Sequence, residues 1–417
     1  MSSFEPTPLD RRRLLRGSGA LGGLSLVGLG GCATASRPAP SLAGQIVGQP
    51  AHEVVPPLAP VRASNDRIFD ITVCLRPFRA AGPRLDTETI GEALVVHNYG
   101  HGGSGWSLSW GSSTIAVRKA MAGSPRAVAV LGCGALGLTS ATLAQRAGAE
   151  VTLYARELLP DTRSSRATGT WTPDSRIALA SAAPPGFAAL WEEMARTSFK
   201  IYRQYLGLPG HPVEWTDRYI VSDISPQEMR TRHRQEGLAR GALDFAQYGE
   251  RIADLRPPFR MLPAASTPFD YPYVLRSEAM MFNLADYGHT LLNDFLAAGG
   301  KIERREFHAP ADLALLKEKV VINCPGYGAR ALWKHESIVP VRGQIAWLIP
   351  QPEVDYGVIY KDVAVLPRRD GIVVQAIEGG DMKGYGDANE TVDRAEAERA
   401  VATIAELYSR FRAPSGA

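Results

Sequence analysis

The sequence is poor in the features that tie a protein to disulfide bonds, to metals or to nucleic acid. Its 417 residues include four cysteines, Cys32, Cys74, Cys133 and Cys324, which are too few and too scattered for a disulfide framework or a zinc site. The 46 Lys and Arg residues nearly balance the 43 Asp and Glu residues, and no basic stripe indicates a nucleic-acid partner. We therefore expect no metal and no nucleic acid, and Cys133 and Cys324 as buried packing residues.

No stretch is long and apolar enough to predict a membrane-spanning helix. The nearest candidate, GSGALGGLSLVGLGG close to the N-terminus, is short and weakly apolar. It follows DRRRLLRG at 10–17, where Arg11 and Arg12 precede Leu14 and Leu15. Paired arginines ahead of a mildly apolar run are the pattern of a twin-arginine export signal. The sequence therefore predicts export to the periplasm by the twin-arginine route.

Two ways of processing this signal, residues 1–32, stay open. The apolar run ends at LGGC, where Cys32 fits a lipobox and would be lipidated, which would anchor the protein to a membrane. Cleavage after Ala35, in the small-residue sequence ATA, would instead discard Cys32. The Pro- and Ala-rich residues 33–65 are predicted to be a tether. The alternative to export is a disordered basic tail on a cytoplasmic protein.

Residues 126–157, RAVAVLGCGALGLTSATLAQRAGAEVTLYARE, have the pattern of a dinucleotide-binding unit. A short apolar strand, AVAVL, leads into G-x-G-x-x-G, a helical stretch and a second strand, VTLYA. The glycines permit a tight turn, close approach of backbone to a pyrophosphate and close helix–strand packing, and the helix N-terminus offers free N–H groups. Glu157, at the end of the second strand, is placed to hold a ribose hydroxyl. The motif alone does not distinguish NAD from FAD.

Several other segments decide between the two cofactors. HNYGHGGSG at 97–105 resembles the flavin loop of the D-amino-acid oxidase family, whose members use FAD, and SSRATGTWTPD at 164–174 resembles its loop crossing the flavin. LRPFRAAGPRL at 75–85 resembles that family's arginine-bearing strand. Weaker likenesses occur in NCPGYGARAL (323–332), PVRGQIAWL (340–348), IYKDVAVLP (359–367) and IEGG (377–380). The resemblance runs from about residue 66 to 410 and implies an FAD enzyme.

The order of these parts differs from the order that the resemblance implies. In the family the G-x-G-x-x-G unit opens the chain and the HNYGHGG-like loop closes it, whereas here the closing portion comes first. The chain is therefore expected to be a circular permutant, joined through AGSPR at 122–126, which requires that the original ends lie close together. The alternative is that the front segment is an inactive duplication, although no second HNYGHGG-like loop is present.

The expected fold class is α/β, with a Rossmann-type FAD-binding domain interleaved with a mixed-sheet substrate domain in circularly permuted chain order. The predicted FAD-binding domain covers residues 79–176 and 285–339. The predicted substrate domain covers residues 66–78, 177–284 and 340–417.

The resemblance also implies the site residues. Arg76 is expected to bind a substrate carboxylate, because its planar guanidinium matches a carboxylate in bidentate fashion, while Arg79 should face the other way. Tyr360 is expected to hydrogen-bond the same carboxylate or to shape the lid, and the alternative is a buried core tyrosine. The backbone carbonyl of Gly103 is expected to accept a hydrogen bond from the substrate amine. His97 and His101 are expected to be structural. The residues expected to bind FAD are Gly132, Gly134, Gly137, Arg156, Glu157, Ser164, Ser165, Gly169, Gly102, Gly105 and Ser107.

The activity that the resemblance implies is FAD-dependent oxidative deamination of a D-amino acid, with O2 or an electron carrier as acceptor. The alternatives are an FAD-dependent dehydrogenase of amines or imino acids that uses a carrier or quinone, and a non-catalytic FAD-binding lipoprotein. Ala364 stands where the family has a second tyrosine, so we expect a roomier pocket. Asp174 is a candidate for recognising a cationic side chain, and the alternative is an exposed loop aspartate.

Replacing both Arg11 and Arg12 by Lys should keep the protein in the cytoplasm, because the export pathway recognises the arginine pair. Fractionation of cells that express a C-terminally tagged chain measures this, with the Arg13→Lys, Arg16→Lys double variant as a charge-matched control. An unchanged periplasmic fraction for the Arg11, Arg12 variant would show that the segment is a basic tail.

Overall fold

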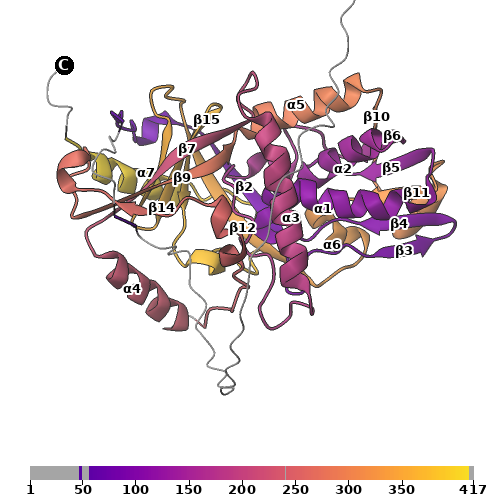
Figure 1. The fold of residues 1–417 in the computed structure, drawn as a ribbon, viewed down its shortest axis with the longest axis horizontal. Helices are drawn as coiled ribbons and strands as arrows, with labels where there is room; N and C mark the ends of the chain where they lie inside the picture. The colour runs from indigo at the N-terminus through magenta and orange to yellow at the C-terminus, as the bar shows by residue number, and fades with distance from the viewer. Residues whose placement is uncertain (1–46, 49–55, 240, 413–417) are drawn as a thin grey trace, which may run out of the picture. The chain divides into compact units, whose positions relative to one another are not determined.

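The computed structural model describes residues 47–48, 56–239 and 241–412, which build two β-sheets with helices packed on them (Figure 1). The predicted export signal, with Arg11, Arg12 and Cys32, lies outside the described residues, as does most of the predicted tether. Within the described part, no helix has the length and apolar character needed to span a membrane.

The six-stranded sheet is the Rossmann-type layer that the sequence predicts. Its central strands are short apolar runs that are buried on both faces, as parallel strands covered by helices must be. Neighbouring strands are parallel except for β3 and β4, which are antiparallel. In spatial order, the strands are β10 (Lys301–Arg304), β6 (Glu150–Ala155), β5 (Ala127–Leu131), β11 (Val320–Asn323), β4 (Ala93–His97) and β3 (Thr87–Ile90).

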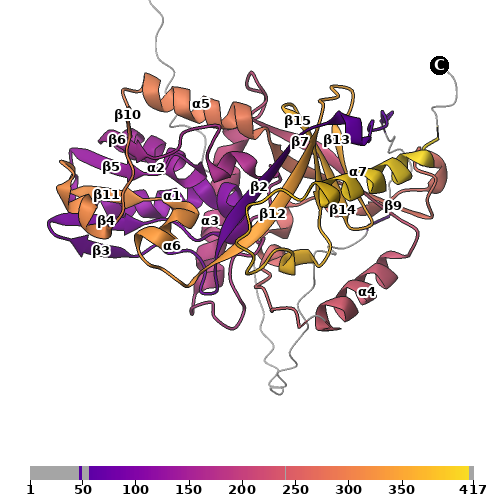
Figure 2. The ribbon, with the colours of Figure 1, turned by 180° about the vertical axis from the view of Figure 1, so that it is seen from behind.

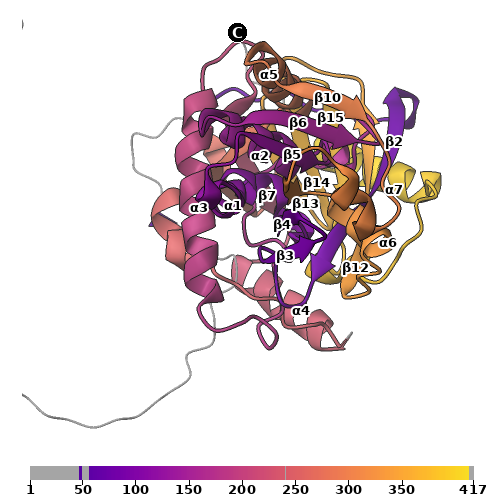
Figure 3. The same ribbon diagram turned by 90° about the vertical axis from the view of Figure 1, so that its right-hand side faces the viewer.

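Helices cover both faces of this sheet. On one face lie α1 (Gly105–Ala120), α2 (Ala135–Arg146) and α5 (Leu284–Ala297), which share a core with β5 and β6. The long helix α3 (Phe187–Tyr202) packs on α1, so that α1 lies between α3 and the strands (Figure 3). The other face is covered by a 3-10 helix, η8 (Pro310–Leu315), and by α6 (Ala329–Leu332).

The nine-stranded sheet is mixed and has one face covered by the C-terminal helix α7 (Arg394–Ser409) (Figure 2). Alternate residues of its strands, such as Val358, Val363 and Val365, pack under α7, and their neighbours face the opposite side. In spatial order, its strands are β1 (Val47–Gly48), β8 (Arg260–Met261), β9 (Tyr273–Phe282), β7 (Val213–Ser222), β13 (Tyr356–Tyr360), β14 (Val363–Arg368), β15 (Gly371–Ala376), β12 (Ile338–Leu348) and β2 (Ile68–Arg79).

The helix α4 (Pro226–Ala239) stands out because none of its residues is buried. Its sequence, PQEMRTRHRQEGLA, has no apolar stripe that could pack on either sheet. It contributes nothing to the arrangement of the glycine-rich loops.

The edge strand β2 connects the two sheets. It pairs antiparallel with β12 from Ile68, opposite Leu348, to Arg79, opposite Ile338. At its far end Phe78 forms a bridge with His101, in the loop after β4 of the other sheet. The front segment of the chain is therefore built into both sheets.

The predicted tether is wrong for its last ten residues. Leu58 and Val61 are 7% and 3% exposed and belong to the core under α7. The backbone carbonyl of Ala59 accepts a hydrogen bond of 2.7 Å from the Tyr356 hydroxyl, which also lies 2.8 Å from that of Tyr408. The segment before β2 thus packs beside the C-terminal helix.

Candidate active site

A cavity of about 410 Å³ opens where the glycine-rich loops of the six-stranded sheet meet β2. We call it the cleft. The N-terminal ends of α1 and α2 both border it, so two sets of free helix N–H groups face one space. Because the cavity extends from one helix N-terminus to the other, it suits an elongated anionic ligand.

The G-x-G-x-x-G turn forms one end of the cleft. Gly132 and Gly134 line it, while Gly137 lies in the first turn of α2 against the Gly132 carbonyl. The Ser164 hydroxyl accepts a hydrogen bond of 3.0 Å from the Ala135 N–H, and a Cβ at position 134 would lie 2.6 Å from the Ser164 oxygen. The turn therefore leaves room for bare backbone to face a phosphate, as the motif predicts.

The end of β6 supplies charged groups to the same part of the cleft. Arg156 and Glu157 both line it. The Arg156 guanidinium lies 2.8 Å from a Glu157 carboxylate oxygen and 2.9 Å from one of Glu306. Glu157 is thus held at the strand end, where an acid can accept hydrogen bonds from ribose hydroxyls.

The loop HNYGHGGSG forms the other end of the cleft. Gly102, Gly103, Gly105 and Ser107 all line it. Gly102 has φ of +54°, and a Cβ there would lie 1.9 Å from the carbonyl oxygen of Arg176. Only glycine fits at this position, because the loop turns sharply against the neighbouring backbone before α1 begins.

The loop that crosses the cleft, residues 163–174, is tied to α1 by three hydrogen bonds. The Trp106 indole N–H donates to the Ser164 carbonyl at 2.8 Å, and the Thr172 N–H donates to the Ser107 hydroxyl at 2.8 Å. The Trp171 indole N–H donates to the Ser107 carbonyl at 3.3 Å. These bonds hold the loop in place, and its residue Gly169 lines the cleft.

The two histidines of the loop are neutral at pH 7. Burial, aided by Arg84, lowers the pKa of His97 to about 4, and burial with Arg79 lowers the pKa of His101 to about 3. His97 lies between Glu88 and Asn323, away from the cleft. His101 lines the cleft, and its Nδ1 is buried without a partner among the described residues. A neutral imidazole can offer that atom to a polar ligand.

Arg76 points from β2 into the cleft, as predicted, whereas Arg79 faces the other way and bonds the Gly82 carbonyl. The Arg76 guanidinium lies over Gly343 of β12, where a Cβ would be 2.4 Å from both terminal nitrogens. Within the described residues, its guanidinium donates one long hydrogen bond, of 3.4 Å, to the Arg342 carbonyl. Burial lowers the pKa of Arg76, whereas nearby Cys74 and Asp381 favour its charged form. The Arg76 guanidinium can therefore bind an anion.

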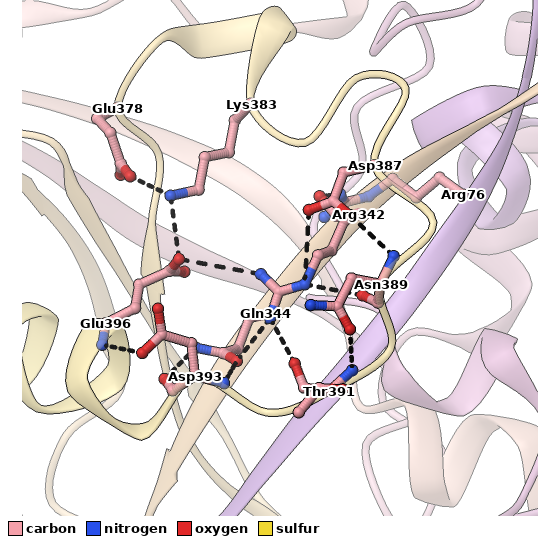
Figure 4. A network of polar contacts seen from close by, with 10 residues as sticks. All are labelled: Arg76, Arg342, Gln344, Glu378, Lys383, Asp387, Asn389, Thr391, Asp393 and Glu396. Carbon is pink, nitrogen blue, oxygen red and sulfur yellow. Dashed lines mark hydrogen bonds and ion pairs between the residues drawn. The ribbon is translucent and has the colours of Figure 1, made fainter.

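A polar network behind Arg76 holds the loop after β15 (Figure 4). The Arg342 side chain donates to the backbone carbonyls of Asn389 and Thr391, each at 2.9 Å. Gln344 exchanges two hydrogen bonds of 2.7 Å with the Asp393 backbone. These contacts anchor the loop to the strand that carries Gly343.

Two charged residues that the sequence analysis missed, Arg176 and Asp381, lie near Arg76, and Asp381 belongs to that loop. Arg176 donates 2.8 Å hydrogen bonds to the carbonyls of Gly380 and Asp381, and its guanidinium lies 3.8 Å from the Asp381 carboxylate. Burial and nearby Arg76 lower the pKa of Arg176 to about 10. Arg176 lies two residues after the end of the crossing loop, and Asp381 directly follows IEGG, so both could have been considered from their position.

Asp174 differs from both sequence-based expectations. It is buried, 7% exposed, and forms a bidentate ion pair with Arg256, with N···O distances of 2.8 and 3.2 Å. Arg256 also lies over the Trp171 ring, 5.5 Å from its centroid. Because its charge is already neutralised, Asp174 is a poor receptor for a cationic side chain.

Two further predicted residues lie outside the cleft. Tyr360 points to the face under α7, where its hydroxyl donates to Glu406 at 3.2 Å and its ring packs on Tyr271. The prediction that it contacts the substrate is therefore wrong, because strand alternation turns it away. Ser165 bonds Thr162 and lines a separate cavity, whereas its neighbour Ser164 faces the cleft. Ala364 does lie on the cleft side of β14.

The sequence signature of the FAD-dependent oxidoreductase (DAO) family matches residues 127–415, well over half of the chain. The chain belongs to this family. Its cofactor is therefore FAD, and the cleft fits it: two helix N-termini, the bare backbone at Gly134 and the unpartnered Nδ1 of His101 all face the same space. Gly134, Ser164 and Glu157 would hold the ADP half, and Gly102, Gly105 and Ser107 the flavin.

Individual relatives cover parts of the chain. A D-amino-acid oxidase of Streptomyces coelicolor is 30% identical over 218 residues, 52% of this chain and 58% of that protein. The chain thus spans less than two thirds of that relative. A D-amino-acid oxidase of Dictyostelium discoideum is 23% identical over 291 residues, 68% of this chain and 73% of that protein. Among solved structures, an L-proline dehydrogenase from P. horikoshii gives a TM-score of 0.46 at 13% identity, covering 69% of this chain and 77% of that one.

Replacing Gly134 by Val should abolish flavin binding, because the new side chain would collide with the Ser164 hydroxyl and distort the turn that must approach the phosphates. The ratio of flavin to protein absorbance after purification measures this. Gly123→Val is the matched control, since a Cβ at position 123 meets nothing within 4 Å. Wild-type flavin content in the Gly134→Val variant would remove the turn from the cofactor site.

Proposed function

We propose that the protein oxidises the α-carbon of a D-amino acid and releases the corresponding keto acid and ammonia. The observation that carries this proposal is Arg76, a buried guanidinium whose fork is open to the cleft. When bound, FAD supplies the acceptor for the hydride that leaves Cα, and O2 then takes the two electrons to give H2O2. Water hydrolyses the imino acid product.

The chain's own residues would act by position and charge. Arg76 would hold the carboxylate in bidentate fashion, which fixes the orientation of Cα toward the flavin side of the cleft. The backbone carbonyl of Gly103 would accept a hydrogen bond from the substrate amine. The positive end of α1, at Gly105, would stabilise negative charge that develops beside it. No imidazole base is required, in line with the low pKa of His101.

Two properties of the site separate this proposal from its alternatives. The Arg76 site is intact, which disfavours a non-catalytic FAD-binding protein. Ala364 is smaller than a tyrosine on the cleft side of β14. The site would therefore accept a substrate with a larger side chain than a tyrosine at this position would permit. An oxidase and a dehydrogenase differ in their electron acceptor. Release of H2O2 in air would identify O2 as the acceptor and the protein as an oxidase.

We also propose that the chain order is circularly permuted and that the protein is exported. Permutation is supported by the family match, which begins at residue 127, and by the contact of α7 with the 3-10 helix η1 (Asn65–Arg67) directly before β2. The twin-arginine route suits a protein that folds around its cofactor before export. Lipidation at Cys32 would add membrane anchoring.

Replacing Arg76 by Met should lower kcat/KM for the best D-amino acid by at least about 30-fold, because one partner of a buried charged pair is lost. The kcat/KM of Arg76→Lys should lie between those of the wild type and Arg76→Met, since lysine keeps the charge but lacks the planar guanidinium. A panel of D- and L-amino acids is screened for flavin reduction without O2, and then for H2O2 release in air. Arg232→Met, on the exposed helix α4, is the control.

Three results would contradict the proposal. Preferential reduction by L-amino acids or by amines lacking a carboxylate would change the substrate class. An unchanged kcat/KM for Arg76→Met would remove Arg76 from the site. Rapid flavin reduction without H2O2 would assign a dehydrogenase.

A further inference from the structure

Arg176 connects the glycine-rich loop before α1 with the loop after β15. Its backbone has φ of +49°, and a Cβ at Gly102 of the first loop would lie 1.9 Å from its carbonyl oxygen. Its guanidinium donates to the carbonyls of Gly380 and Asp381 in the second loop, each at 2.8 Å. The backbone of Arg176 therefore contacts one loop, and its side chain holds the other.

The loop after β15 lies directly beside Arg76. The Arg342 carbonyl, which accepts the hydrogen bond from Arg76, also contacts Gly384 of this loop, where a Cβ would be 2.1 Å from that oxygen. The Arg342 N–H donates to the Gly384 carbonyl at 2.9 Å. Asp381 stands three residues before Gly384. Burial lowers the pKa of Arg76, whereas Cys74 and Asp381 raise it, so the Asp381 carboxylate attracts the Arg76 guanidinium.

The Asp381 carboxylate interacts more strongly with Arg176 than with Arg76. It lies 3.8 Å from the Arg176 guanidinium. Burial raises the pKa of Asp381 and Asp174 adds to the rise, while Arg176, Gln247 and Arg76 oppose it, in decreasing order of effect. Two arginines thus share one partly buried acid, and Arg176 is its principal counter-ion.

The lysine of this loop is engaged elsewhere. Lys383 lies 3.4 Å from the Glu396 carboxylate and also pairs with Glu378 (Figure 4). Among the described residues, Arg76 is therefore the cation that would remain for Asp381 if the Arg176 guanidinium were removed. A partly buried carboxylate is costly without a counter-ion, so this loss would favour an Asp381–Arg76 ion pair.

We propose that Arg176 is a positioning residue for substrate binding, which holds Asp381 away from Arg76 and so leaves Arg76 available to the substrate carboxylate. This inference rests on the proposed function. A carboxylate of the protein that paired with Arg76 would compete with the substrate at a high effective concentration, because it belongs to the same chain. The competition lowers substrate affinity and leaves the chemical step of bound substrate largely unaltered.

Second-site rescue tests this competition. Arg176→Met should raise KM for the best D-amino acid by about tenfold and change kcat by less than about threefold, because Asp381 then occupies Arg76. Adding Asp381→Asn to Arg176→Met should return KM to within about threefold of the wild-type value, since asparagine carries no charge. Asp381→Asn alone should not raise KM. The KM of Arg176→Lys should lie between those of the wild type and Arg176→Met.

Controls separate this role from a structural one. Arg118 and Glu193 form an exposed ion pair of 3.3 Å, and neither Arg118→Met nor Arg118→Met with Glu193→Gln should change KM. All variants must keep wild-type flavin content and melting temperature. Arg176→Gln, which retains a donor for the backbone carbonyls, serves if Arg176→Met does not fold. An unchanged KM in the Arg176 variant, or a raised KM that Asp381→Asn does not restore, would overturn the inference.

Binding without turnover separates this inference from the function on which it rests. Calorimetry on flavin-loaded protein compares butyrate with butyramide, which has the same shape and no charge. Butyrate should bind wild type more tightly, lose about tenfold in affinity in Arg176→Met and regain it with Asp381→Asn. That pattern supports the inference even if no D-amino acid reduces the flavin, which would be a failure of the proposed function.

Two other results of the binding experiment contradict the inference. Arg76-dependent turnover of a D-amino acid, with an affinity loss in Arg176→Met that Asp381→Asn does not relieve, overturns the inference and leaves the proposed function standing. Wild-type protein that binds butyrate no better than butyramide would overturn both.

Discussion

The pairing of β2 with β12 is the interaction on which the site depends. It runs along the whole of β2, and it sets Arg76 diagonally over Gly343. The absence of a side chain at Gly343 lets a guanidinium lie flat on the sheet and point into the cleft. A one-residue slip would turn every side chain of β2 to the other face, so the register of the long ladder also sets the position of the Arg76 guanidinium.

Charge balance is the second constraint. Buried ions cost several kcal/mol each unless they are paired, and Arg176 and Arg256 each find an acid brought in by a loop, Asp381 and Asp174. Both loops are fastened elsewhere, one by Arg342 and Gln344 and the other by α1. These fastened loops hold the charged side chains in fixed positions, which is a form of electrostatic preorganisation.

The parts of this arrangement that were predictable from sequence are those in which the chemistry lies in one short stretch. The G-x-G-x-x-G unit and HNYGHGG each carry their own turn geometry, and both lie at the cleft as expected, with Arg76 beside them. FAD and the α/β fold followed from them and are confirmed by the family. The wrong predictions concern direction and partners. Tyr360 was expected on the substrate side of a strand whose phase the resemblance did not determine.

Asp174 is an example of a wrong prediction about partners. Its partner Arg256 lies 82 positions further along the chain, and no local pattern announces the pair. Leu58 and Val61 are examples of a third kind of wrong prediction. A Pro- and Ala-rich stretch has the composition of a tether whether or not its few apolar residues pack into a core.

The central claim is that a front segment and the later glycine-rich unit build one site, whatever their order in the chain. Ala59 and Tyr408 both bond the Tyr356 hydroxyl, so residue 412 can be joined to residue 56 by a short linker, with the new chain beginning at residue 123. The measurement is the flavin content and kcat/KM of this rearranged protein as a monomer. The account predicts values close to those of the parent chain. A folded monomer without flavin, or folding only as a strand-swapped dimer, would contradict it.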